Sequence, residues 1–125
     1  MIDRPFVDSV PGVEARVEPR MQVRWRGQLV TEDGRRLAVR IVDISASGAG
    51  LVGDDKLAVS QPVILEAQVP RLPTLDSHTI ERWRGTVAFQ TFKDSALRSG
   101  LKFQDLTADD QALLRAWLDR HQNRR

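Results

Sequence analysis

A chain of 125 residues, 41% of them hydrophobic, is long enough for one domain with a single core. It has no cysteine, which excludes disulfides and thiolate chemistry, and its two histidines, His78 and His121, stand far apart, so we expect no metal site. The formal charge is only +2, but sixteen of the nineteen basic residues are arginine, whose planar guanidinium suits phosphates and guanine edges. A GC-rich genome produces the same bias, so the bias alone does not indicate a function.

We expect neither a membrane span nor a secretory signal. The sequence has no run of 18 apolar residues, the length that a membrane-spanning helix needs. Residues 1–5 are not followed by the apolar stretch of a secretory signal. The sequence therefore predicts a cytoplasmic protein with no membrane insertion.

Residues 1–19 are predicted to form a flexible arm, because three prolines and a glycine interrupt every regular pattern there. From Met21 onward, apolar and polar residues alternate, which is typical of half-buried strands, and Glu32-Asp33-Gly34 is a hairpin signal. The predicted strands cover residues 21–31, 37–42, 49–52, 62–69, 81–91 and 99–104. Short strands with turns at this spacing favour an antiparallel barrel or sandwich over residues 20–106.

The last segment, 107–125, has helical periodicity. Thr107 is a good N-cap, and Asp109 and Asp110 fall in the first turn, where the helix dipole favours acidic residues. Apolar residues then recur at helical spacing, at Leu113, Leu114, Trp117 and Leu118. The sequence predicts one amphipathic helix over about 108–121, packed against the strands.

Motifs for catalysis are missing from the sequence. It contains no cysteine nucleophile, no glycine-rich phosphate loop and no pair of histidines at helical spacing. Carboxylates are plentiful, but every soluble domain has them. We therefore expect a protein that is not an enzyme.

Arginine recurs at every fourth position just before and inside the first predicted strand, at Arg16, Arg20 and Arg24. In a chain this rich in arginine, such spacing arises easily by chance. These three arginines, which we call the arginine ladder, indicate a binding site only in combination with the motif that follows them.

That motif is the segment 43–48, Asp-Ile-Ser-Ala-Ser-Gly. On an extended strand end, Asp43 and Ser45 project to the same side. Asp43 can accept hydrogen bonds from guanine N1–H and the exocyclic amine, and Ser45 can donate or accept. Gly48 permits a positive φ and lets a backbone N–H approach a ligand closely. Taken alone, this pattern is more often a simple turn in which Asp and Ser cap backbone amides.

The order of these features resembles the PilZ domain family. The family signature is R-x-x-x-R in an N-terminal switch region, followed by D/N-x-S-x-x-G, which Asp43, Ser45 and Gly48 fill here. The similarity covers about residues 16–120. It implies the family's fold, which is all-β with one C-terminal α-helix, in the form of a six-stranded antiparallel β-barrel.

Two arginine pairs satisfy the first part of the signature. In the family, the second arginine usually sits directly before the first strand, so we prefer Arg16 with Arg20 and keep Arg24 as a reserve candidate. Many members carry another arginine where this chain has Ala15, which favours one bound nucleotide over two. Phe89 matches the place of an aromatic residue that stacks on a guanine in many members, but an ordinary core phenylalanine is an equally good interpretation.

The resemblance implies a single-domain cyclic di-GMP receptor that orders its arm on binding. It would signal to a partner protein in motility, adhesion, secretion or polysaccharide synthesis. The alternative is a PilZ-like adaptor that does not bind nucleotide. We do not expect a nucleic-acid-binding module, because aromatic residues are few and seventeen acidic residues nearly balance the charge. The implied ligand-binding residues are Arg16, Arg20, Arg24, Asp43, Ser45, Gly48 and Phe89.

Overall fold

The computed structural model describes residues 18–122, so nearly all of the predicted arm lies outside the described residues. No helix within this range is both long and apolar enough to cross a membrane. The elements of residues 18–122 are, in chain order, β2 (Arg20–Thr31), β3 (Arg36–Ser45), β4 (Gly48–Gly53), β5 (Pro62–Pro70), β6 (His78–Lys93), β7 (Ala96–Phe103) and α1 (Ala108–Gln122).

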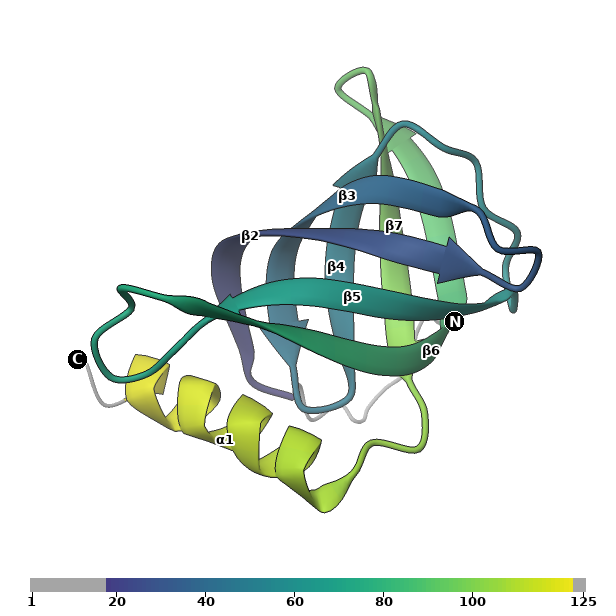
Figure 1. The fold of residues 1–125 in the computed structure, drawn as a ribbon. Helices are drawn as coiled ribbons and strands as arrows, with labels where there is room; N and C mark the ends of the chain where they lie inside the picture. The colour runs from purple at the N-terminus through teal and green to yellow at the C-terminus, as the bar shows by residue number, and fades with distance from the viewer. Residues whose placement is uncertain (1–17, 123–125) are drawn as a thin grey trace.

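The strands form one antiparallel sheet in the order β2-β3-β4-β7-β6-β5. Because β2 pairs with both β3 and β5, the sheet closes on itself as a barrel, and α1 lies across one end of it (Figure 1). Every one of these strands is therefore paired on both sides over at least part of its length. The predicted fold, a six-stranded antiparallel barrel followed by one helix, is confirmed.

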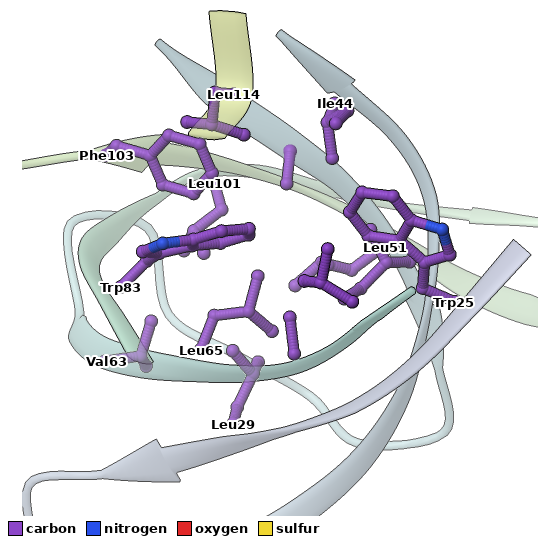
Figure 2. Close-up of a cluster of buried hydrophobic side chains, with 14 of the residues drawn as sticks. Trp25, Leu29, Ile44, Leu51, Val63, Leu65, Trp83, Leu101, Phe103 and Leu114 are labelled. Atoms are coloured by element: carbon purple, nitrogen blue, oxygen red, sulfur yellow. The ribbon is translucent and has the colours of Figure 1, made fainter. Parts of the chain in front are cut away.

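Apolar side chains from all six strands fill the barrel (Figure 2). Trp83 is fully buried at the centre and meets Phe103 edge to face, with ring centroids 5.3 Å apart. Trp25 of β2 meets Trp117 of α1 in the same way at 5.2 Å. Edge-to-face pairs of this kind add to the stabilisation from burial, so the helix is part of the core.

Thr107 caps α1 as predicted. The Asp110 N–H donates to Thr107 Oγ1 at 3.0 Å, and the Thr107 N–H donates back to Asp110 Oδ2 at 3.4 Å. This reciprocal arrangement satisfies two amides that a helix start leaves unpaired. The predicted apolar stripe is the packing surface of the helix, and its buried members are Leu114, Trp117 and Leu118.

The hairpin between β6 and β7 is longer than predicted. Lys93 pairs with Ala96, so β7 begins well before the expected position 99, and β6 begins at His78 rather than at 81. The two residues between them, Asp94 and Ser95, have φ angles of 53° and 65°. Two successive positive φ values are typical of a type I′ turn, which usually carries Asn-Gly or Asp-Gly. Asp-Ser is a weaker signal, so the sequence pattern left residues 92–98, between the two predicted strands, unassigned.

Bulges turn Asp43 away from the core. Between Ile41 and Asp43, β3 carries one residue more than β4, and β2 carries one more than β3 nearby. Ile41 and Ile44 are fully buried, whereas Val42 and Asp43 between them are partly exposed. Bulges redirect side chains in this way. As a result β3 continues past its predicted end at 42 and carries Asp43 on the outside of the barrel.

Candidate functional site

Asp43 lies between two arginines on the outer surface of the barrel. Arg20 Nη1 of β2 donates to Asp43 Oδ1 at 2.6 Å, and Arg98 Nη2 of β7 lies 3.5 Å from Asp43 Oδ2. The Asp43 side chain is only 15% exposed, whereas the side chains of Arg20 and Arg98 are 56% and 46% exposed. The site is thus a fixed carboxylate with two solvent-accessible cations around it.

Two shallow concavities meet at this carboxylate. The larger, about 860 Å³, includes Arg24 and Arg40, and the other, about 430 Å³, includes Arg20 and Phe89. Asp43 and Arg98 line both of them. A ligand with several acceptor groups would therefore meet four arginines around one acidic group.

Glycines form the floor beside Asp43. Gly50 of β4 pairs with Gly100 of β7 in the sheet. A Cβ atom on Gly50 would lie 2.6 Å from Asp43 Oδ2, and one on Gly100 would lie 2.2 Å from Cε2 of the Phe89 ring. Both distances are shorter than van der Waals contact. Only glycine lets the carboxylate and the aromatic ring lie this close to the sheet.

Phe89 is a surface residue. A register shift between Val87, which is buried, and Phe89 turns the latter outward, where it lies against Gly100 and is 47% exposed. The interpretation as an ordinary core phenylalanine is therefore wrong. An exposed ring held against a glycine floor offers one face for stacking on a flat ligand.

Ser45 differs from the expectation of an exposed hydroxyl beside Asp43. It is 1% exposed, and its Oγ accepts hydrogen bonds from the N–H groups of Gly48 at 3.1 Å and Ser47 at 3.4 Å. The same hydroxyl donates to the Gly48 carbonyl at 3.3 Å. Ser45 thus holds the β3–β4 turn together, and a direct contact between Ser45 and a ligand stays a prediction.

Gly48 is required for a different reason from the one expected. Its φ is not positive; among the described glycines only Gly34 has a positive φ, of 88°. A Cβ atom on Gly48 would instead lie 2.3 Å from the carbonyl oxygen of Leu101 in β7. Glycine at this position allows two strands to approach closely beneath the site.

The structure brings most of the predicted site residues together. Arg20, Arg24, Asp43, Gly48 and Phe89 all line the two concavities. Arg16 lies outside the described residues, so the choice between the Arg16–Arg20 and Arg20–Arg24 pairs stays a prediction.

Sequence reasoning missed the contact that ties the arm to the turn. Ser47 Oγ donates to Glu18 Oε1 at 2.6 Å, and Ser47 occupies a variable position of the second motif. It also missed Arg98, Gly50 and Gly100, which come from β4 and β7. No local signal marks them, because their role depends on which strands are neighbours.

A second carboxylate on the barrel surface has a different character. Both oxygens of Glu66 are occupied, Oε1 by Gln28 at 2.7 Å and Arg36 at 2.8 Å, and Oε2 by Arg82. The hydrogen bond from Gln28 and the charges of the two arginines lower the pKa of Glu66. None of these residues lines the concavities at Asp43, so the Glu66 cluster is separate from the candidate site. Within residues 18–122, no three His, Asp or Glu side chains lie close enough to hold a metal ion.

The fold is similar to that of several solved structures. The Bacillus subtilis inhibitor of motility MotI/DgrA matches with a TM-score of 0.70 and 20% identity over 88% of this chain. Escherichia coli YcgR in complex with c-di-GMP matches with a TM-score of 0.68 and 12% identity over 87% of this chain. The chain spans about half the length of these two proteins, 52% and 46% respectively. The separate PilZ domain of YcgR with c-di-GMP matches with a TM-score of 0.63 and 13% identity, and the match covers 87% of this chain and 95% of that domain.

Family membership comes from the sequence match. No curated protein matches the chain at a significant level. The sequence model of the PilZ domain family matches residues 14–120, which include both motifs, the whole barrel and nearly all of α1. The chain therefore belongs to the PilZ domain family.

Proposed function

We propose that this chain is a cyclic di-GMP receptor, that it binds its ligand at the two concavities around Asp43, and that it is not an enzyme. The observation that carries the proposal is the partly buried Asp43 carboxylate between the exposed guanidinium groups of Arg20 and Arg98. The site also has an exposed aromatic ring, Phe89, beside these charged groups.

The chemistry of cyclic di-GMP matches these groups. Asp43 can accept from guanine N1–H and from the exocyclic amine with its two oxygens. Arg20 and Arg24 can pair with phosphate oxygens or with guanine O6 and N7. The exposed face of Phe89 can stack on a guanine, since base–aromatic stacking needs only a free ring face. With Ala15 in place of another arginine, we propose that one nucleotide binds per chain.

The similar structures support the choice of ligand. Two of them, YcgR and its separate PilZ domain, are complexes with c-di-GMP, and so is MrkH from K. pneumonia, which matches with a TM-score of 0.62. MotI/DgrA is an inhibitor of motility. At identities this low the similarity shows only that the fold is shared. The ligand and a role in motility are therefore part of our proposal for this protein.

The proposal includes signalling through the arm, in the cytoplasm. Arg16 lies two positions before Glu18. Glu18 accepts a hydrogen bond from Ser47 in the turn beside the site. A cavity of about 470 Å³ is also lined by this turn, through Ala46 and Ser47, together with Glu18, Pro19 and residues of α1. A ligand that draws Arg16 toward Asp43 would order the arm and reshape this cavity, which would present an altered surface to a partner protein.

A competition titration tests the proposal. The purified chain is titrated with cyclic di-GMP by calorimetry, alone and in the presence of GMP or single-stranded RNA. We expect binding that excess RNA does not displace and that GMP displaces weakly. Binding to RNA would favour a nucleic-acid module, and no binding to any of the three would favour the adaptor. Recovery of linear dinucleotide or GMP after incubation would show that the protein is an enzyme.

A further inference from the structure

Arg98 belongs to neither PilZ motif, yet it reaches the same carboxylate as Arg20. It lies on β7 opposite Val52 of β4, whereas Asp43 lies on the far side of β4 opposite Gly50. Its guanidinium therefore extends across β4 to within 3.5 Å of Asp43 Oδ2.

We infer that Arg98 is a third ligand-binding arginine, which pairs with Asp43 in the structure and transfers to cyclic di-GMP on binding. The inference rests on the proposed function. A guanine edge presents two donors, N1–H and the exocyclic amine, to the two oxygens of Asp43, and each of these oxygens lies beside a guanidinium, Oδ1 beside Arg20 and Oδ2 beside Arg98. The guanine donors would therefore approach the same oxygens as the arginines, and we expect both arginines to exchange Asp43 for acceptors on the ligand.

The exchange leaves every group paired. Asp43 loses two guanidinium partners and gains the two guanine donors, while the arginines gain phosphate oxygens or guanine O6 and N7 as acceptors. Both arginine side chains are about half exposed, so they can change partners without disturbing the core. The negative charge of Asp43 thus holds the arginines beside the site without blocking it.

The position of Arg98 separates it from the other cations of this surface. Arg40 lines only the larger concavity and Lys102 only the one that contains Phe89, whereas Arg98 lines both. A ligand that spans Asp43 and Phe89 and extends toward Arg24 passes Arg98 in between. Arginine suits this position because its rigid planar fork matches two acceptors side by side, whereas the three donors of a lysine ammonium have no such fixed geometry.

Arg82 is a matched control for Arg98. Its side chain is 55% exposed and it pairs with Glu66, which is 11% exposed, so its surroundings resemble those of Arg98 and Asp43. Arg82 lines neither concavity. Loss of either arginine therefore removes one exposed positive charge and one ion pair with a nearly buried carboxylate, but only Arg98 stands at the proposed site.

The test measures cyclic di-GMP affinity by calorimetry for the wild type, Arg98→Ala, Arg98→Lys and Arg82→Ala. Loss of a charged hydrogen bond should make Arg98→Ala bind about 10- to 100-fold more weakly. Arg98→Lys should regain part of this loss, and Arg82→Ala should stay near the wild type. Melting temperatures confirm folding, and Arg98→Gln replaces Arg98→Ala if the latter is unstable. If the wild type binds and Arg98→Ala binds no more weakly than Arg82→Ala, the inference is wrong and the receptor function stands. If the wild type itself does not bind, the receptor function is wrong.

Discussion

Arg20 Nη1 donates a hydrogen bond of 2.6 Å to Asp43 Oδ1, and this contact joins the two PilZ motifs across 23 positions of the chain. It runs diagonally between β2 and β3, because Arg20 faces Ser45 in the register and Asp43 faces Gln22. Arg20 is thereby held against Asp43 of the second motif.

The arginine ladder should divide into binding and non-binding members. Arg20→Ala should weaken cyclic di-GMP binding by about 2 kcal/mol, mostly through faster dissociation, because it removes a charged protein group that donates hydrogen bonds to the ligand. The true partner of Arg20 should lose affinity as well, and we expect this to be Arg16 rather than Arg24. Stopped-flow kinetics and calorimetry on the three single variants give the answer. Equal losses for Arg16→Ala and Arg24→Ala would contradict our choice of register.

Phe89 should contribute by stacking, and the same strand offers a matched control in Phe92. Phe92 is 73% exposed and lines neither concavity, whereas Phe89 is 47% exposed and lies against Gly100. Phe89→Ala should cost about 1–3 kcal/mol of binding, the usual contribution of an aromatic ring under a base. Phe92→Ala should leave the affinity unchanged. Equal effects of the two substitutions in a calorimetric titration would argue against stacking on Phe89.

Two glycines should respond to alanine in opposite ways. The new Cβ of Gly48→Ala would meet backbone, the Leu101 carbonyl oxygen, whereas that of Gly100→Ala would meet the movable Phe89 ring. Gly48→Ala should therefore destabilise the fold by about 1–3 kcal/mol, as crowding in a packed region does. Gly100→Ala should displace the ring, lower the affinity for cyclic di-GMP and change the melting temperature less. Urea unfolding and ligand titration of both variants check this, and a larger loss of stability in Gly100→Ala would contradict it.

Trp117 should be the main anchor of α1. It is 7% exposed and packs against Trp25, so Trp117→Ala should lower the free energy of unfolding by about 3–5 kcal/mol. Arg120 lies over the same ring at 5.7 Å from its centroid, and Arg120→Ala should cost no more than about 1 kcal/mol. Urea denaturation measures both. A loss below about 1 kcal/mol for Trp117→Ala would mean that the stripe is not the helix's packing surface and serves as a docking surface instead.

Sequence periodicity predicts the barrel and the helix because both depend on local patterns. Alternation placed the strands, and Thr107 with its following acidic residues located the start of α1. The full length of the β6–β7 hairpin was not predicted, because its turn is Asp94-Ser95 rather than a glycine-containing pair. Strand ends are thus harder to predict than strand cores.

The site could be predicted only where it coincides with a motif. Asp43 and Arg20 were found in this way, but the bulges that turn Asp43 outward depend on pairing with β2 and β4 and leave no local pattern. Arg98 and Gly100 join the site because β7 is the next strand but one from β3. Such residues come together only when β4 pairs with both β3 and β7, and periodicity does not specify which strands are neighbours.

The most direct test of the account is a calorimetric titration of the wild type and Asp43→Ala with cyclic di-GMP, together with their melting temperatures. The wild type should bind with micromolar affinity or tighter. Asp43→Ala should lose about 2–5 kcal/mol of binding, because guanine donors are left without an acceptor, while its fold stays close to that of the wild type. No heat and no thermal shift for the wild type at about millimolar ligand, a concentration that would detect even weak binding, would contradict the account. So would an Asp43→Ala variant that melts at a lower temperature but binds cyclic di-GMP as tightly as the wild type.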